Sequence, residues 1–390
     1  MSKGVFNQSL NVQQDVAEDL QLAAYDYELP PDRIAQHPAT PRDSSRLLAV
    51  TSPHTHAHHI FRDLPNLLKP GDLLVLNNTQ VIPARLFGRK VGGAKVEVLL
   101  LEERERDCWL GLVRPGRRLK PGARIEFFDR HVSLDDLGDA VPKLTATVLA
   151  ADPDTAGRLI QFEFPAHTSL LAIVQEIGHM PLPPYITQSD AADEERYQTV
   201  FGDRPGSAAA PTAGLHFTPE LLTTLTAKGI DQCFVTLHVG VGTFRPVESD
   251  VITNHVMHGE WLEVPESAVE QIRKTKAQGG RVIAVGTTAT RALEGASVEG
   301  ELKPYCGKTS LFVYPGYQWR TIDGLITNFH LPKSSLMMMV SALIGRKRLL
   351  ALYEEAIAQQ YRFYSFGDAM LILPEGRAVP MGTTQHRDEG

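Results

Sequence analysis

Two histidines lie in short segments where glycine, other small residues and threonine accumulate. His216 ends the run Ala-Pro-Thr-Ala-Gly-Leu-His from Ala210, and His238 precedes Val-Gly-Val-Gly-Thr-Phe-Arg. Next to such residues the backbone can approach a ligand closely and donate its own N–H groups. A single buried histidine is more often a packing residue than a catalyst, but two such segments flank one expected helix. We therefore predict that His216 and His238 belong to an active site.

A third candidate lies in His255-Val-Met-His258-Gly-Glu260. In an extended chain His258 and Glu260 share one face, so the carboxylate could orient or protonate the imidazole. The His-x-x-His spacing with a nearby acid could instead ligate a metal, but the sequence shows no third ligand. We predict proton transfer by these residues and no metal.

Two strand ends carry further polar groups. At Val285-Gly286-Thr287-Thr288-Ala-Thr-Arg291 an apolar strand turns on glycine into a helix, whose N-terminal N–H groups favour an anion or a carboxylate. Another apolar strand ends at Asn328 and His330, the position where open α/β sheets place ligands. By contrast, the dense cluster His54-Thr-His-Ala-His-His59 is interpreted as a surface loop with at most adventitious metal affinity.

Composition is that of a globular protein long enough for two domains, with 390 residues of which 43% are hydrophobic. No apolar run reaches the roughly 18–20 residues that cross a bilayer. The first 24 residues lack a basic start with an apolar core, so we expect a flexible extension and not a secretory signal. The three cysteines are widely spaced, which fits free thiols in a reducing cytoplasm.

Charge is concentrated in one segment. The segment from Arg85 to Arg130 contains twelve Lys and Arg and seven Asp and Glu, a net charge of +5. Because the whole chain has a net charge of −7, the rest of the chain has a net charge of −12. The total argues against a general nucleic-acid coat. A local basic segment indicates contact with a polyanion, although an ordinary solvated face has a similar composition.

The same segment has the periodicity of short strands separated by turns. Leu-Lys-Pro-Gly occurs twice, and Gly-Gly, Arg-Pro-Gly and Asp-Pro-Asp separate other strands, a spacing typical of a small antiparallel barrel. The expected strands are Leu73–Leu76, Ala84–Lys90, Ala94–Leu101, Trp109–Val113, Ile125–Phe128, Leu144–Ala150 and Leu159–Phe164.

Helices alternate with strands on both sides of that segment. Thr218 before Pro219 predicts a capped helix to Lys228 followed by a strand Asp231–His238, and helix Glu266–Ala277 precedes strand Arg281–Val285. The predicted fold is an α/β main domain with an inserted small antiparallel β-barrel. We place the extension at 1–24, the α/β domain at 25–68 and 165–375, the barrel at 69–164 and a tail at 376–390.

From Tyr25 to Leu373 the chain resembles the S-adenosylmethionine:tRNA ribosyltransferase-isomerase family of queuosine biosynthesis. Many motifs in one order carry this resemblance. They are Tyr25-Asp-Tyr-Glu-Leu-Pro, Pro41-Arg-Asp-Ser-Ser-Arg-Leu, Leu76-Asn-Asn-Thr-Gln-Val-Ile-Pro-Ala-Arg-Leu, Met180-Pro-Leu-Pro-Pro-Tyr-Ile, Ala210-Pro-Thr-Ala-Gly-Leu-His-Phe, the glycine-rich strand to Val247, Val285-Gly-Thr-Thr, Thr327-Asn-Phe-His-Leu-Pro and Tyr361-Arg-Phe-Tyr-Ser-Phe-Gly-Asp-Ala-Met.

The resemblance implies an enzyme that transfers and isomerises the ribosyl part of S-adenosylmethionine onto 7-aminomethyl-7-deazaguanine at the wobble position of tRNA. The products would be epoxyqueuosine-tRNA, adenine and methionine. S-adenosylmethionine would be a co-substrate, and no metal or other cofactor is expected. The implied partner is a tRNA carrying the precursor base, and we expect a cytoplasmic monomer that does not bind membranes.

Roles follow from the resemblance together with the residue types. We expect His216, His238 or His258 to remove the proton, with Glu260 orienting the last. Arg291, Thr287 and Thr288 would hold the methionine carboxylate. The remaining pocket residues would be Gly286, Asn328, His330, Gly240, Gly242 and Thr243, and contacts to tRNA or nucleoside would come from Arg42, Asp43, Arg46, Asn77, Arg85, Arg117, Arg118 and Arg245.

Two other classes of protein stay open at this stage. An S-adenosylmethionine-dependent RNA methyltransferase would use the same donor, but the glycine-rich first turn with a downstream acidic ribose ligand is not recognisable. A non-catalytic RNA-binding protein built around the barrel would leave the histidine and glycine segments unexplained.

Overall fold

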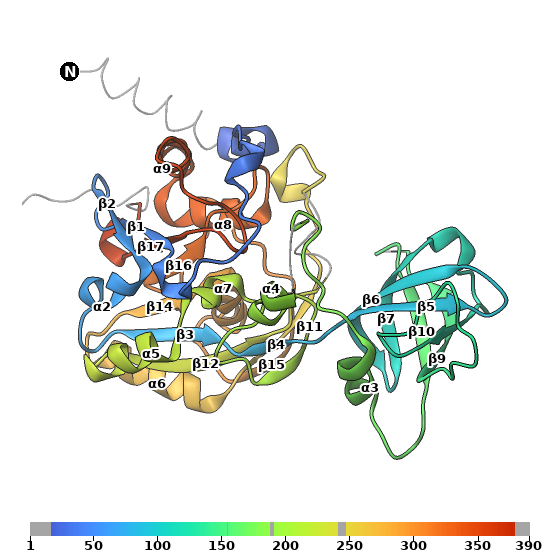
Figure 1. Cartoon of the computed structure of the whole chain (residues 1–390). Helices are drawn as coiled ribbons and strands as arrows, with labels where there is room; N and C mark the ends of the chain where they lie inside the picture. The colour runs from blue at the N-terminus through green and yellow to red at the C-terminus, as the bar shows by residue number, and fades with distance from the viewer. Residues whose placement is uncertain (1–16, 154, 188–190, 241–246, 379–390) are drawn as a thin grey trace, which may run out of the picture. The chain divides into compact units, whose positions relative to one another are not determined.

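The computed structural model describes residues 17–153, 155–187, 191–240 and 247–378. The chain divides into two compact units, 1–77 with 212–236 and 245–390, and 78–211 with 237–244. The first unit is built on a mixed nine-stranded sheet and the second contains a closed six-stranded barrel (Figure 1). The predicted fold class, an α/β domain with an inserted antiparallel barrel, is confirmed.

Four strands at the centre of the sheet run parallel. They pair in the order β12 (Asp231–Leu237), β3 (Leu73–Asn77), β14 (Val282–Val285) and β16 (Gly324–Asn328). Every residue of β3, β14 and β16 is buried, as expected for parallel strands covered on both faces.

The remaining strands extend this sheet on both sides. β17 (Ala369–Ile372) pairs antiparallel with β16 and parallel with β1 (Arg46–Val50), and β2 (His56–Ile60) forms the edge. At the other end β13 (Glu260–Val264) pairs with the edge strand β15 (Tyr305–Thr309). The helices of this unit are α2 (Leu64–Leu67), α5 (Pro219–Ala227), α6 (Glu266–Ala277), α7 (Gly286–Gly295), α8 (Ser335–Ile344) and α9 (Arg346–Ala358).

Side-chain caps explain where two of these helices begin. Thr218 Oγ1 accepts a hydrogen bond from the N–H of Leu221 at 3.1 Å, and Pro219 occupies the first helical position of α5. Ser334 caps α8 in the same way, through the N–H of Met337 at 3.2 Å. The helices and strands predicted for this part of the chain are confirmed to within a few residues.

The barrel consists of six antiparallel strands in the order β10-β7-β6-β5-β8-β9. Its apolar interior is shared with α3 (Leu170–Ile177), whose buried face packs against the barrel core. The strands are β5 (Arg85–Lys90), β6 (Lys95–Glu105), β7 (Cys108–Arg114), β8 (Arg124–Phe127), β9 (Leu144–Ala151) and β10 (Arg158–Glu163). This unit also contains α4 (Ala191–Arg196) and the short parallel pair β4 (Thr79–Val81) and β11 (Arg204–Ser207).

Three predictions about these elements are wrong. Leu73–Leu76, expected to open the barrel, is β3 of the central sheet, because its unbroken apolar run is buried on both faces. The histidine-rich segment 54–59 overlaps strand β2 from His56 onward and is not only a loop. Residues 17–24 are not a loose extension, since Glu18 and Asp19 form ion pairs with the buried Arg346 at 2.9 and 2.6 Å.

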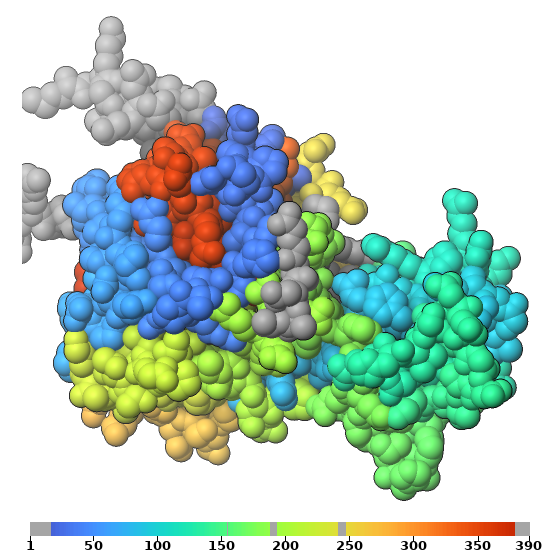
Figure 2. Space-filling view, viewed as in Figure 1, coloured from blue at the N-terminus to red at the C-terminus, as the bar shows by residue number. Residues whose placement is uncertain are grey.

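Distant parts of the sequence meet on one face of the first unit. In Figure 2 residues near the C-terminus, coloured red, lie among N-terminal residues, coloured blue. The contacts include the guanidinium of Arg46, which stacks over the ring of Tyr361 at 3.8 Å and donates to the carbonyl of Gln359. No helix in the described ranges is both long and apolar enough to cross a membrane.

Before β3 and β14 a buried ion pair joins the two strands. Asp72, 2% exposed, accepts hydrogen bonds from Arg281 Nε at 2.8 Å and Nη2 at 2.6 Å and from the N–H of Lys69 at 2.7 Å. We expect Asp72→Asn to lower the free energy of unfolding by ~3 kcal/mol, because it leaves a largely buried guanidinium with only the exposed Glu375 as a charge partner. Urea unfolding measures this difference.

Glu375→Gln provides the matched control, because Glu375 also contacts Arg281, at 3.2 Å, but is 47% exposed. Its loss should cost less than about 1 kcal/mol. Equal effects of the two substitutions would contradict the importance of the buried pair.

Candidate active site

Polar residues collect where the central parallel strands end. β3 ends in Asn77, β14 leads directly into Gly286-Thr287-Thr288, and β16 ends in Asn328. The carboxyl ends of parallel strands meet at one edge of the sheet, where α/β proteins place their ligands. The structure thus brings the segments at Val285 and Thr327, predicted separately from sequence, to one edge of the same unit.

The segment around His216 joins this edge. Thr212–His216 forms a 3₁₀ helix in which Thr212 Oγ1 donates to Asn328 Oδ1 at 3.3 Å. Ala213 packs against the first turn of α7. A Cβ added to Gly286 would lie 3.5 Å from the Cβ of Ala213, which is ordinary van der Waals contact. Three predicted motifs therefore converge in the first unit.

The hydrogen bonds of His216 fix its tautomer. Asn328 Nδ2 donates to the carbonyl of Tyr364 at 3.1 Å and to His216 Nε2 at 3.2 Å, so Nε2 accepts. His216 Nδ1 then carries the proton and donates to Ser45 Oγ at 2.7 Å. The ring stacks on Phe61 with centroids 4.8 Å apart. Ser45 and Phe61 were not predicted, because 171 and 155 residues separate them from His216 along the chain.

Burial keeps this imidazole neutral. His216 is 4% exposed, and desolvation, helped by the nearby charges of Arg362 and Arg42, lowers its pKa to about 3. His330 is 8% exposed, and burial likewise lowers its pKa to about 3. Its Nε2 lies 2.9 Å from Thr327 Oγ1. Both rings are neutral at pH 7, the form that can accept a proton.

The first turn of α7 presents donors to this edge. Gly286 adopts a φ of 89°, which favours glycine and lets the chain turn directly from β14 into the helix. No side chain caps the helix, so its first N–H groups have no partner within α7. Thr288 Oγ1 is buried without a hydrogen-bond partner among the described residues. An anionic or carbonyl group would satisfy these donors.

Arg291 lies in the middle of α7 and pairs with Glu260. Both side chains are buried, at 4% and 3% exposure, and Arg291 Nη1 donates to Glu260 Oε2. Arg291 Nε and Nη2 have no hydrogen-bond partner within the part of the chain that the structure describes. A buried guanidinium with two unused donors suits a carboxylate ligand. Glu260, which we predicted to orient His258, thus forms an ion pair with Arg291.

His238 belongs to the second unit. It follows β12, is half-buried, and its Nδ1 lies 2.8 Å from Thr79 Oγ1. Burial lowers its pKa to about 4. Its ring lies against Gly206, where an added Cβ would come within 2.8 Å of Nε2, so that position requires glycine. Gly240 is also described, whereas Gly242, Thr243 and Arg245 lie outside the described residues.

The residues predicted to contact tRNA differ in their exposure and in their partners within the protein. Arg46 stacks on Tyr361, Asp43 lies 3.4 Å from Arg62, Asn77 is 1% exposed, and Arg85 pairs with Glu97 at 2.7 Å. Arg42, which is half-buried, lies near enough to His216 to influence its charge. Arg117 and Arg118 are exposed in a 3₁₀ turn, and with Arg114 and Lys120 they form the basic turn.

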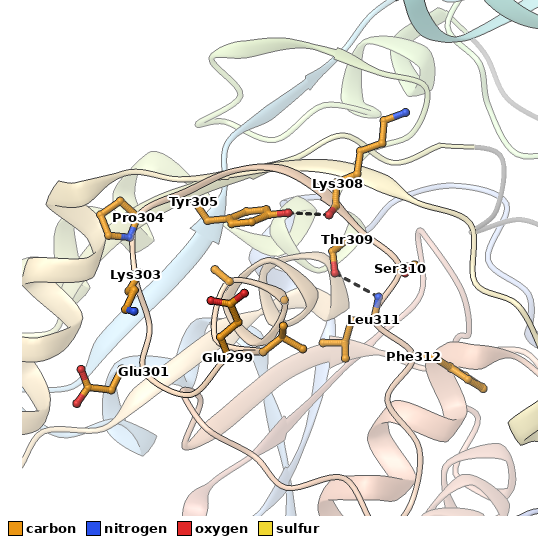
Figure 3. A pocket seen from close by; sticks show the side chains of 13 residues that line it. Glu299, Glu301, Lys303, Pro304, Tyr305, Lys308, Thr309, Ser310, Leu311 and Phe312 are labelled. Atoms are coloured by element: carbon orange, nitrogen blue, oxygen red, sulfur yellow. Dashed lines mark hydrogen bonds between the residues drawn. The ribbon is translucent and has the colours of Figure 1, made fainter.

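A pocket of about 590 Å³ opens in the first unit between the end of α7 and strand β15 (Figure 3). Its rim mixes acids and lysines, among them Glu299, Glu301, Lys303 and Lys308. Tyr305 folds back to donate to the carbonyl of Lys308 at 2.8 Å. None of the predicted site residues lines this pocket, although Thr309, the strand partner of Glu260, does line it.

Comparison with known proteins identifies the family. A profile of the queuosine biosynthesis protein family matches residues 22–372. S-adenosylmethionine:tRNA ribosyltransferase-isomerases of Nostoc sp. and Thermosynechococcus vestitus are 61% and 58% identical, covering 94% and 92% of this chain and 95% and 97% of their own. The crystal structure of S-adenosylmethionine tRNA ribosyltransferase from Thermotoga maritima aligns with a TM-score of 0.50 and 38% identity, covering 90% of this chain and 100% of its own. The chain belongs to the queuosine biosynthesis protein family.

The depressed pKa of His216 predicts a pH-dependent stability. The unfolded chain protonates this imidazole below about pH 6.5, whereas the folded protein leaves it neutral down to a pKa of about 3. The free energy of unfolding should therefore decrease as the pH is lowered from about 6.5 to about 3, by about 1.4 kcal/mol per pH unit from this group. His216→Gln should remove that part of the slope in urea unfolding between pH 4 and 6. Superimposable slopes for the two proteins would show that the ring is not held neutral.

Proposed function

We propose that the protein transfers and isomerises the ribosyl moiety of S-adenosylmethionine onto 7-aminomethyl-7-deazaguanine at the wobble position of tRNA, giving epoxyqueuosine-tRNA, adenine and methionine. The observation that carries the proposal is the 61% identity, over 94% of the chain, to a relative named for this activity. The convergence of the His216, Gly286 and Asn328 motifs at one sheet edge supports it independently.

The chemistry needs a base and no oxidant. The sulfonium of the donor acidifies the hydrogens on the adjacent ribose carbon, and a base removes one as a proton. The electron pair left on that carbon forms a double bond to C4′ as the ring oxygen departs, and this oxygen becomes a carbonyl at C1′ as adenine leaves with its bonding pair. The amine of the tRNA base then adds to C4′ and loses a proton, and the carbanion regenerated beside sulfur attacks the C1′ carbonyl. The resulting alkoxide closes the epoxide by displacing methionine. Each group that departs takes its bonding electrons with it, so the sequence is balanced without a metal or redox cofactor.

Among the predicted bases, His238 has the most suitable surroundings. Thr79 Oγ1 holds its Nδ1, and the ring is half-buried, so a substrate can still reach it. His216 uses both ring nitrogens in hydrogen bonds to Ser45 and Asn328, an arrangement that suits a positioning residue. His258, half-buried before β13, remains the third candidate.

The donor's methionine carboxylate is proposed to bind Arg291, through the Nε and Nη2 atoms left by Glu260, with Thr287 and Thr288 at the start of α7. Asn328 and His330 would line the pocket beside them. Gly240, together with Gly242 and Thr243, would let the backbone approach the substrate.

The basic turn is proposed to contact the tRNA backbone. Arg114, Arg117, Arg118 and Lys120 are exposed, and within the described ranges none of them forms an ion pair. Several other basic residues of the barrel are neutralised by neighbours, as Arg85 is by Glu97 and Lys95 by Asp135 at 2.6 Å. We also propose Arg42, Asp43, Arg46, Asn77 and Arg245 as contacts to tRNA or nucleoside.

We further propose a cytoplasmic monomer. The cysteines Cys108, Cys233 and Cys306 form no disulfide, which fits a reducing compartment, and the tRNA substrate belongs there too. Light scattering of the purified chain tests the monomeric state.

Labelled S-adenosylmethionine and tRNA carrying the precursor base should yield adenine and methionine in equal amounts with modified tRNA. Methyl transfer would yield S-adenosylhomocysteine instead, and a binding protein would yield neither product. His238→Ala should reduce turnover by ~10²–10⁴, because a general base contributes about that much.

His216→Ala and His258→Ala test the other two candidates in the same assay. The matched control is His167→Ala, an exposed histidine of the same unit as His238, which should keep full turnover. Turnover within a few-fold of the parent for all three candidate variants would show that none of them is the base.

Neutralising the basic turn should weaken tRNA binding. The double variant Arg117→Ala/Arg118→Ala removes two phosphate contacts, so the slope of log affinity against log salt should become shallower by ~1.5. Filter binding over a range of salt concentrations measures both quantities. Arg104→Ala/Arg106→Ala, an equal charge loss on another exposed part of the barrel, is the control. Identical affinity and slope for the Arg117/Arg118 variant would exclude the basic turn from the interface.

A further inference from the structure

Two histidines and a carboxylate from opposite ends of the chain meet on the first unit, in a cluster that includes none of the proposed active-site residues. His56 and His58 are two residues apart on β2 and so project from the same face of that strand. Glu355 comes from α9. β2 is the edge strand, four positions along the sheet from β14, whose carboxyl end carries Gly286.

The ligand atoms of this cluster are already close to the spacing of a metal site. His56 Nε2 lies 2.9 Å from Glu355 Oε2, and His58 Nε2 lies 2.9 Å from Glu355 Oε1. One atom of each side chain falls within 4.8 Å of the other two. In a tetrahedral zinc site with bonds near 2.0–2.1 Å, ligand atoms are about 3.3 Å apart. Small rotations of these partly exposed side chains would therefore suffice to bring the ligand atoms to that spacing.

Neighbouring groups hold these ligands in place. His58 Nδ1 lies 2.7 Å from the hydroxyl of Tyr361, which leaves Nε2 facing the carboxylate. Metal-bound histidines commonly donate their other ring N–H to such an oxygen. Tyr361 is itself covered by the guanidinium of Arg46, and Gln359 Nε2 donates to Glu355 Oε1 at 3.1 Å.

We propose that His56, His58 and Glu355 form a zinc-binding site, with water as the fourth ligand. Two imidazoles, one carboxylate and a water form a donor set that occurs in zinc sites of proteins. The ion would fasten the edge strand β2 to α9 and so stabilise the folded protein. The competing explanation is an ordinary ion-pair cluster, in which protonated histidines bind Glu355 and no metal is held.

The test uses the full chain without a polyhistidine tag, stripped of metal with a chelator. Zn²⁺ is titrated at pH 7.5 in competition with a chromophoric chelator. One site per chain is expected, and His58→Ala or Glu355→Gln should weaken it by at least ~10-fold. Co²⁺ should give the visible absorption bands of a tetrahedral site in the parent and not in these variants.

Two controls keep the outcome specific. His59→Ala removes an imidazole from the opposite face of the same strand, and His54→Ala removes one just before the strand, so both should bind Zn²⁺ like the parent. Zn²⁺ should also raise the urea midpoint of the parent but not of Glu355→Gln, whose fold is checked by circular dichroism. Binding weaker than about 100 µM, or binding unchanged by the His58 and Glu355 substitutions, would overturn the site. Neither result depends on ribosyl transfer.

Discussion

Parallel pairing of β12, β3, β14 and β16 is the constraint on which the proposed chemistry depends. Parallel strands all end at one edge, so residues that follow them meet there however far apart they are in sequence. Asn328 shows the consequence, because its amide binds Thr212, His216 and the carbonyl of Tyr364 at once. A shift of β16 by one residue would turn this amide to the other face of the sheet and break all three contacts.

Burial at this edge sets the charge of its groups. His216 and His330 are held neutral because both rings are buried and, among the described residues, no carboxylate hydrogen-bonds to either ring. The carboxylate of Glu260 compensates the charge of the buried Arg291, although Arg291 Nε and Nη2 have no hydrogen-bond partner in the described structure. A donor left unsatisfied in a buried position costs roughly 1–3 kcal/mol. A ligand carboxylate would recover that free energy, which would make binding and folding stability interdependent.

The sequence predicted the helices and strands better than the tertiary contacts between them. Barrel strands such as β8 and β9 alternate buried and less buried residues, and this alternation made them recognisable. β3 lacks the alternation and was misplaced, although an unbroken apolar run is itself typical of a parallel strand. The motifs at Ala210, Val285 and Thr327 were predicted as site segments. Their contacts were not, because the pairing of Arg291 with Glu260, or of Glu355 with His58, arises only from tertiary packing.

The position of a base beside a sulfonium imposes one more requirement. A positive donor disfavours an imidazolium next to it, so a histidine that accepts the proton must pass it on or be compensated. Thr79 Oγ1 lies 2.8 Å from His238 Nδ1, where it can accept a hydrogen bond from the Nδ1–H and so stabilise part of the positive charge that proton uptake would create. In His216 both ring nitrogens are hydrogen-bonded, because Asn328 donates to Nε2 and Ser45 accepts from Nδ1. We therefore propose a fixed, positioning role for His216 and keep His238 among the proposed bases.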